Sequence, residues 1–309
     1  MSFLLSGYFA YMISFLAIYS ALAVVLHLQV FRAGIVNFGI VGFWGLGMYI
    51  TAIFLLRLDM PFFVALILAS IITGLISIPL AKVILNLDGE AVLVGTLAFA
   101  TIIENLVMGN KDLTGGSIGI GTISIPINAG QYSQFVYALL IVGFLVLLMW
   151  YASRIKNAPY GRLLLSIKDN EQLSRSLGKP TLKHKIVIFS ITCGVLAFFG
   201  GLTAPLYSHL YPMMITPAVT FTAWIALIVG GQARISGAVV GVIATVFLFE
   251  YLLMSIIPLP AATAQIVPFL KYVAYGLMLV LLLMFKPSGI LGDKKKGSKP
   301  KGQKVQVER

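Results

Sequence analysis

Long apolar stretches alternate with short polar segments along almost the entire chain. Several of the apolar stretches approach or exceed the ~20 residues that an α-helix needs to cross the hydrocarbon core of a bilayer. We therefore predict an all-α polytopic membrane protein with about nine transmembrane helices, the pattern leaving eight to ten open. The expected spans are 9–28, 34–56, 61–85, 91–108, 133–152, 185–209, 217–231, 237–257 and 265–285.

Two of these spans differ from a plain apolar helix. Glycine and other small residues interrupt the stretch 34–56, so its start is the boundary that the pattern defines least. The stretch 217–231 is short. For this stretch we expect a broken or re-entrant helix buried among its neighbours, where irregular backbone is tolerated.

The composition agrees with a membrane protein. Of 309 residues, 59% are hydrophobic and only 10% are charged, which is too apolar for a soluble domain. The single cysteine, Cys193, lies within an apolar stretch, so no internal disulfide is expected. His27, His184 and His209 are widely separated, and no metal-binding or catalytic motif is recognisable. We therefore predict no metal site and no catalytic residue.

Positive charge is concentrated in two segments. The chain has 22 Lys and Arg residues and a net charge of +12, and eight of the 22 lie in residues 153–185 and eight in 286–309. Short basic segments stay on the cytoplasmic side of a membrane, and an even number of expected spans separates these two. We therefore predict a cytoplasmic C-terminus and an N-terminus outside. Arg32 then lies inside, and Arg57 and the loop 109–132 lie outside.

The same pattern divides the chain into a membrane domain and a tail. Residues 1–292 form the expected transmembrane domain, which includes a cytoplasmic loop at 153–184. Residues 293–309 form a basic cytoplasmic tail that we expect to be disordered. We favour a tail at the lipid surface over one that binds nucleic acid, because basic segments beside membrane spans are attracted to anionic lipids.

The polar loop has a helical pattern of its own. It includes YGRLLLSIKDNEQLSRSLG from Tyr160, and four of its apolar positions share one face of a helical wheel. Asp169 or Asn170 is suited to cap a new helix, while Gly178 followed by Pro180 forms a helix stop. We predict one or two short helices, which either lie on the lipid surface or dock to a cytoplasmic partner. The apolar positions are Leu163, Ile167, Leu173 and Leu177.

Polar residues within the apolar spans are candidates for a transport path. Asn37 lies in a glycine-rich span, where an amide usually faces protein or a water-filled cavity and glycines permit close helix packing. Asn37 and Trp44 either line a path or bond and pack against neighbouring helices. Glu104 and Glu250 are the acidic residues within spans, and we favour a structural role for each. The candidate path residues are Asn37, Gly39, Trp44 and Glu104.

Five short motifs follow one another between residues 34 and 292. They read GIVNFGIVGFWGLGMY, LTGGSIGI, YGRLLLSIKDNEQLSRSLG, IVGGQARISGAVVG and FKPSGILG. In this order, the set resembles the permeases of branched-chain amino acid ABC transporters, of the Liv type and LivM-like. Two positions depart from the family pattern: Ile40 stands where many of these permeases have His, and Glu104 stands where a basic residue is more common.

This resemblance implies an ABC importer permease fold and a division of labour. A second permease subunit, identical or different, would complete the translocation path in the plasma (inner) membrane of a prokaryote. Two cytoplasmic ATPase subunits would use ATP, and an extracytoplasmic solute-binding protein would deliver the substrate. This chain has no Gly-x-x-x-x-Gly-Lys-Ser/Thr motif, so we expect it to bind no cofactor and to be no enzyme itself.

The resemblance also gives the polar loop a role. Residues 160–178 would couple the permease to the ATPases, with some side chains as apolar anchors and others as orienting charges. The anchors would be Leu163, Ile167 and Leu177, and the charges Arg162, Lys168 and Glu171. The complete set of coupling residues is Gly161, Arg162, Leu163, Ile167, Lys168, Glu171, Leu177 and Gly178.

A second class of function is a stand-alone, ion-coupled secondary transporter of small solutes. Such a protein is expected to have a carboxylate or an unwound helix near the membrane midplane, and Glu104 is the partial candidate for that ion site. For an ABC importer, the resemblance favours branched-chain amino acids, although related permeases carry other amino acids, amides or urea.

Overall fold

The computed structural model describes residues 7–231 and 234–252, together with isolated positions near the C-terminus, namely 273, 276, 277, 280, 284 and 289–291. Within this part, seven helices are long and apolar enough to cross a membrane. Their presence confirms the all-α polytopic class. They are α1 (Gly7–Ala33), α2 (Ile40–Arg57), α3 (Phe62–Ile84), α4 (Gly89–Gly109), α6 (Ser133–Asn157), α9 (Thr181–Tyr207) and α10 (Pro217–Gly230), with the short turns η1 (Gly130–Tyr132) and η2 (Pro212–Ile215) extending α6 and α10.

The remaining elements are short. An apolar helix, α11 (Ile235–Val242), continues into the π-helical stretch η3 (Ile243–Leu252) and covers most of the span expected at 237–257. The span expected at 265–285 lies outside the described residues, apart from single positions. The other short elements are α5 (Lys111–Thr114), β1 (Ile120–Gly121), α7 (Pro159–Asp169), α8 (Glu171–Ser176) and β2 (His209–Leu210).

The start of the second span differs from the prediction. Helix α2 begins at Ile40, so residues 34–39 are not helical although the apolar pattern included them. Gly34 has a φ of +69°, a left-handed conformation that glycine adopts without steric cost, and it ends α1. The six residues form a non-helical link that is held by side-chain hydrogen bonds, as described below.

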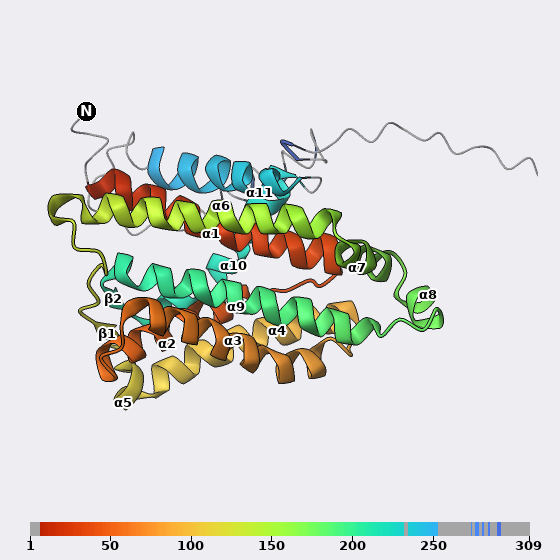
Figure 1. The fold of residues 1–309 in the computed structure, drawn as a ribbon, viewed down its shortest axis with the longest axis horizontal. Coiled ribbons are helices and arrows are strands. Elements are labelled where there is room, and N and C mark those ends of the chain that lie inside the picture. Colours follow the sequence, from red (N-terminus) through yellow and green to blue (C-terminus); the bar gives the residue numbers. More distant parts are fainter. Residues whose placement is uncertain are drawn as a thin grey trace, which may run out of the picture.

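Helix α9 lies at the centre of the bundle and packs against α1, α2 and α3 (Figure 1). Two glycines bring α2 and α9 into backbone contact. A Cβ atom added to Gly47 would meet the carbonyl group of Ala197, and one added to Gly200 would meet that of Trp44. Small residues allow such close packing between membrane helices, where dispersion contacts provide much of the attraction. This pair of glycines therefore fixes the α2–α9 interface.

The two ends of the bundle carry different elements. Helices α7 and α8 project from one end, and β1, β2 and α5 lie at the other (Figure 1). Lys168 of α7 lies 3.4 Å from the carbonyl oxygen of Phe31 near the end of α1. At the opposite end, Ile120 pairs with Leu210, and Arg57 donates a hydrogen bond of 2.6 Å to a backbone carbonyl of the 109–132 loop. These contacts confirm which segments share an end of the bundle.

Candidate functional site

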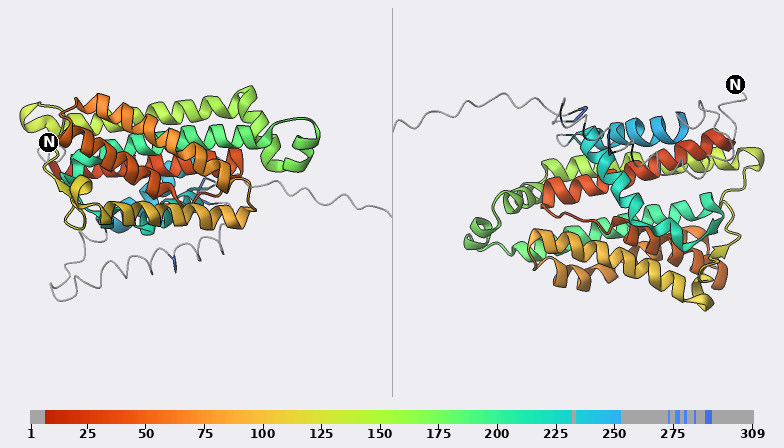
Figure 2. Two further views of the ribbon diagram at one scale, coloured as in Figure 1. Left: turned by 90° about the horizontal axis from the view of Figure 1, so that it is seen from below. Right: turned by 180° about the vertical axis from the view of Figure 1, so that it is seen from behind.

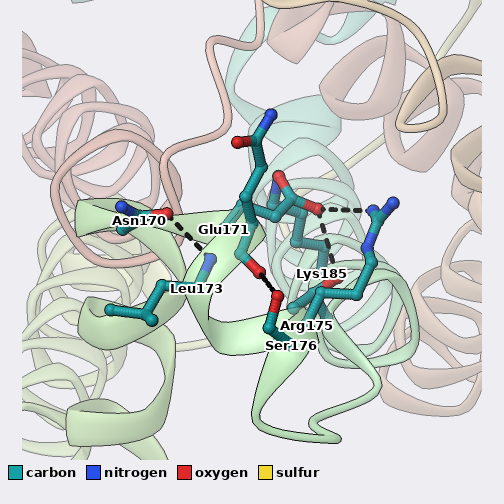
Figure 3. Close-up of polar contacts among 8 residues, drawn as sticks. Asn170, Glu171, Leu173, Arg175, Ser176 and Lys185 are labelled. Atoms are coloured by element: carbon teal, nitrogen blue, oxygen red, sulfur yellow. Dashed lines mark hydrogen bonds and ion pairs between the residues drawn. The ribbon is translucent and has the colours of Figure 1, made fainter.

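The segment 159–178 forms two short helices, as predicted. Pro159 occupies the first turn of α7, where its missing N–H leaves no hydrogen bond unmade. Asn170 caps α8 because its side-chain oxygen accepts a hydrogen bond of 2.9 Å from the backbone N–H of Leu173 (Figure 3). Gly178 has a φ of +77° and donates to the carbonyl of Arg175, which stops the helix. The predicted cap and stop are both confirmed.

Glu171 connects α8 to the first turns of α9. Its Oε1 accepts hydrogen bonds of 3.2 Å from Arg175 and from Thr181, and its Oε2 pairs with the ammonium group of Lys185 (Figure 3). Partial burial raises the pKa of Glu171, but the hydrogen bonds and positive charges of Lys185 and Arg175, with the Thr181 hydroxyl, outweigh it. The pKa of Glu171 therefore lies below its usual value, and the carboxylate is ionised at neutral pH.

The apolar side chains of this segment point in two directions. Leu164 and Ile167 are buried against the membrane helices, whereas Leu173 and Leu177 are 58% and 68% exposed. The burial of Ile167 does not fit its predicted role as an anchor on a partner, because its side chain already packs within this chain. Leu163 is half-buried. A helical wheel shows which residues share a face, but it does not show which body that face meets.

The remaining coupling candidates are one buried and two exposed residues of α7, and one exposed residue at the end of α8. Arg162 is exposed and donates a hydrogen bond of 3.0 Å to the carbonyl oxygen of Asn157. Lys168 is exposed and lies 5.4 Å from the centre of the Phe31 ring. Gly161 is buried and Gly178 is exposed. The segment thus presents cationic and apolar side chains to its surroundings from a backbone that is held in place.

Asn37 is the centre of a buried polar network. Its side chain donates a hydrogen bond of 3.0 Å to Gln29 of α1 and accepts one of 2.8 Å from the backbone N–H of Gly39. Gln29 in turn donates to Thr192 of α9 at 2.7 Å, and the indole of Trp224 in α10 donates to the Asn37 carbonyl at 3.2 Å. The network pairs the Asn37 side chain, the Asn37 carbonyl and the Gly39 N–H of the 34–39 link. This placement favours the interpretation in which Asn37 bonds its neighbours.

Gly39 and Trp44 also lie in the interior. A Cβ atom added to Gly39 would meet the carbonyl oxygen of Thr96, so glycine permits the contact between the link and α4. The side chain of Trp44 is buried, and its indole N–H donates a hydrogen bond of 3.2 Å to Thr203 of α9. Trp44 is therefore a packed aromatic, which was the second of the two alternatives for this residue.

Polar side chains also lie on the outer face of α4, which runs along an edge of the bundle (Figure 2). Thr101 and Asn105 are exposed there, and Glu104 is half-buried. Thr101 and Asn105 line a groove of about 600 Å³, most of whose other lining residues are apolar, among them Val94 and Ile102. Asn105 donates to the Thr101 carbonyl at 2.8 Å, so its amide is not held by another helix. Asn105 was not among the predicted path residues, although its spacing of four residues from Thr101 is visible in the sequence.

Exposed polar groups in the middle of a membrane span are costly unless they face water or another protein. Of the four predicted path residues, Glu104 is half-buried at the side of this face and does not line the groove, while Asn37, Gly39 and Trp44 are internal. Glu250 belongs to η3, and its side chain lies outside the described part of the structure. The site is therefore divided between the α4 face and the 159–178 segment.

These features define the chain as a multi-pass helical membrane protein with a folded segment at one end and a polar face along one span. Residues 8–284 match the model of one protein family, described as the permease component of branched-chain amino acid transport systems. The chain belongs to this family, which is a family of transport permeases. Its membership confirms the resemblance that the five ordered motifs indicated.

Named relatives agree with this assignment. The chain is 26% identical to a probable branched-chain amino acid transport permease protein LivM of Methanocaldococcus jannaschii, over 84% of this chain and 73% of the relative. It is 24% identical to the high-affinity branched-chain amino acid transport system permease proteins LivM of Salmonella typhimurium and Escherichia coli, over 89% of this chain and 68% of each relative. No solved structure matches the chain.

Proposed function

We propose that this chain is a membrane-spanning permease subunit of an ATP-driven importer for branched-chain or other amino acids. Family membership supports transport, and the observation that carries ATP coupling is the 159–178 segment. Two short helices are held to the bundle by Leu164, Ile167 and Glu171, while Leu173 and Leu177 remain outside. The segment has the rigidity and the exposed apolar side chains that a contact with a separate ATPase requires.

The ion pair of Glu171 suggests how movement would pass through the subunit. A force on α8 acts on Lys185 and Thr181 through the Glu171 carboxylate, and both residues belong to α9. Helix α9 packs along α2 and α3 at the centre of the bundle. Displacement of α8 by an ATPase would therefore move the helix that contacts most of the membrane domain.

The basic segments give the orientation. Positive charge favours the cytoplasmic side. The end that carries α7 and α8 would thus face two ATPase subunits, and the C-terminus would be cytoplasmic. The opposite end, with α5 and the β1–β2 pairing, would face an extracytoplasmic solute-binding protein. In this orientation the N-terminus lies outside, in the plasma membrane of a prokaryote.

The α4 face is the part of this subunit that would line the path. A second permease subunit opposite Thr101 and Asn105 would enclose the groove between the two subunits, with Glu104 at its side. Such a passage would give the exposed polar groups in the second half of this span a polar environment. Residues Asn37 and Trp44 would support the path by holding α2 in position.

The test is to purify the tagged chain from its native membranes in mild detergent and to identify the bound proteins by mass spectrometry. We expect two kinds of protein, an ATPase and a second permease. Leu177→Asp is expected to reduce ATPase recovery about tenfold, since it places a charge on the docking surface. Leu113→Asp is the matched control because Leu113 is 50% exposed at the opposite end of the bundle.

Two results would contradict the proposal. The first is equal loss of ATPase in both variants, because the effect would then not depend on the 159–178 segment. The second is a purified chain that recovers no ATPase and transports amino acids in liposomes under an ion gradient. That outcome would favour the secondary transporter.

A further inference from the structure

A cavity of about 550 Å³ lies between the 159–178 segment and the membrane helices. The walls come from three parts of the chain: the link after α1, the turn between α3 and α4, and the helices α7 to α9. The volume is within the ~300–1,000 Å³ range of small-molecule sites. The cavity is separate from the α4 groove, since the two share no lining residue.

The lining of this cavity combines three kinds of group. Its cationic residues are Lys168, Arg175 and Lys185, and its acidic residues are Asp88 and Glu171. Of these, Glu171 and Lys185 are paired with each other. The side chain of Asp88 makes no hydrogen bond to the α4 N-terminus that it precedes. The apolar residues include Ile35, Leu87 and Val92.

We propose that this cavity binds an α-amino acid with an aliphatic side chain at the cytoplasmic end of the bundle. The inference rests on the proposed function, which supplies the orientation and the amino acid as imported solute. The substrate carboxylate would face Lys168, whose ammonium group would turn toward it from the Phe31 carbonyl oxygen 3.4 Å away. The substrate ammonium group would face Asp88. The substrate side chain would lie against Ile35 and Val92, both largely buried at the wall. The cavity therefore holds product after import.

Other ligand classes fit the same lining less well. A phosphate or another multivalent anion would be attracted by the three cations but would make no use of the Asp88 carboxylate or of the apolar wall. A purely apolar ligand would cover the Asp88 carboxylate without giving it a partner, which is unfavourable. A zwitterion with an aliphatic side chain complements all three kinds of group at once.

Binding in this cavity would also affect coupling. The ligand would contact α7 and α8 on one side and the α3–α4 turn on the other, so it would join the coupling segment to the membrane helices. A bound amino acid would thus oppose displacement of α8 and slow further import. The cavity is a site through which accumulated product inhibits the transporter.

The first test measures binding of radiolabelled leucine to the purified full chain in lipid nanodiscs by equilibrium dialysis. Gly89 lines the cavity, and a Cβ atom added there meets no heavy atom within 4 Å. Gly89→Leu therefore occupies space at the cavity wall with little strain, and we expect it to weaken binding about tenfold or more. Gly109→Leu is the matched control, since Gly109 ends the same helix and is equally open.

Two analogues test the zwitterion. Leucinol lacks the carboxylate and 4-methylvalerate lacks the ammonium group, and we expect both to bind much more weakly than leucine. Asp88→Asn is expected to remove the preference for leucine over 4-methylvalerate. It serves as the second variant because Asp88 is exposed and its change does not disturb packing.

Unchanged leucine binding in Gly89→Leu, or equal binding of leucine and 4-methylvalerate to the unmodified chain, would overturn the inference. These measurements need no ATPase and no binding protein. The chain could instead bind leucine, lose that binding in Gly89→Leu, and still associate with no ATPase. That result would contradict only the proposed function. In the assembled transporter, leucine inside the vesicles should slow uptake, and Gly89→Leu should abolish that inhibition.

Discussion

Glu171 at the start of α8 and Lys185 in the second turn of α9 form an ion pair across 14 positions of sequence. The Lys185 side chain is 15% exposed and that of Glu171 is 32% exposed. The pair thus lies partly out of water, where it is stronger than a pair on an open surface. With the hydrogen bonds of Thr181 to Glu171 and of Tyr160 to the His184 carbonyl oxygen, it holds the 159–178 segment to the central helix.

Glu171→Gln should therefore leave the chain folded and yet reduce transport clearly. The amide keeps the size of the side chain but loses the charge that attracts Lys185, and we expect a loss of about 0.5–1.5 kcal/mol in the free energy of unfolding. ATP-driven uptake should fall severalfold, since α8 would be less firmly joined to α9. Arg162→Gln serves as a comparison at an exposed cation of the same segment, with a smaller expected effect on stability.

The lowered pKa of Glu171 predicts that the stability of the fold depends on pH. The folded chain lowers the pKa of Glu171, so its ionised form stabilises the fold above its unfolded pKa of about 4.3. This contribution should be lost as the pH falls through the lower, folded pKa. Thermal unfolding in detergent between about pH 7 and 3 should show it. Glu171→Gln should be less sensitive to acid than the unmodified chain, and an identical pH profile would contradict the assignment.

Two asparagines allow a matched test of the buried network and the α4 face. Asn37→Leu removes partners from Gln29 and from the backbone of Gly39, so we expect a loss of about 2–4 kcal/mol in stability. Asn105→Leu should change stability by less than about 0.5 kcal/mol, because Asn105 is exposed. Asn105→Leu should nevertheless reduce uptake.

The measurements for this pair are the melting temperature of each purified variant and its uptake in the assembled transporter. If Asn37→Leu and Asn105→Leu lowered the melting temperature equally, Asn37 would not be the internal amide and Asn105 the exposed one. Normal uptake in a stable Asn105→Leu variant would contradict the assignment of the α4 face to the path.

Gly200 should tolerate no larger side chain. A Cβ atom there would meet the carbonyl oxygen of Trp44, so Gly200→Val should separate α2 from α9 and cost about 3 kcal/mol or more. Gly143→Val is the control because a Cβ atom added to Gly143 in α6 meets no atom within 4 Å. The yield of monodisperse protein in detergent should fall for the first variant and remain normal for the second.

The sequence predicts the position of most spans because apolar runs of membrane length have few alternatives. Helices α3, α4 and α9 begin and end within a few residues of the predicted limits. The cap at Asn170 and the stop at Gly178 were also predictable, since each depends on the chemistry of one residue. These features are local, and local chemistry is what a sequence presents directly.

Features that depend on neighbouring helices were harder to predict. The link 34–39 is as apolar as a helix, and the hydrogen bonds that Asn37 donates to Gln29 and accepts from Trp224 hold it in another conformation. Likewise, the wheel grouped Ile167 with Leu177, but one is buried and the other is exposed. Sidedness of this kind is decided by the tertiary fold.

The pairing of β1 with β2 has a consequence for biogenesis. Ile120 and Leu210 are joined by backbone pairing, and the ring of His209 donates to the carbonyl of Ile118 at 2.8 Å. The chain between them includes α6 and α9, so β2 emerges from the ribosome long after β1. The pairing can form only when α9 has crossed the bilayer and the residues that follow it have left the insertion machinery. It is therefore a late event in assembly, and protection of its amides would report that insertion of α6 and α9 is complete.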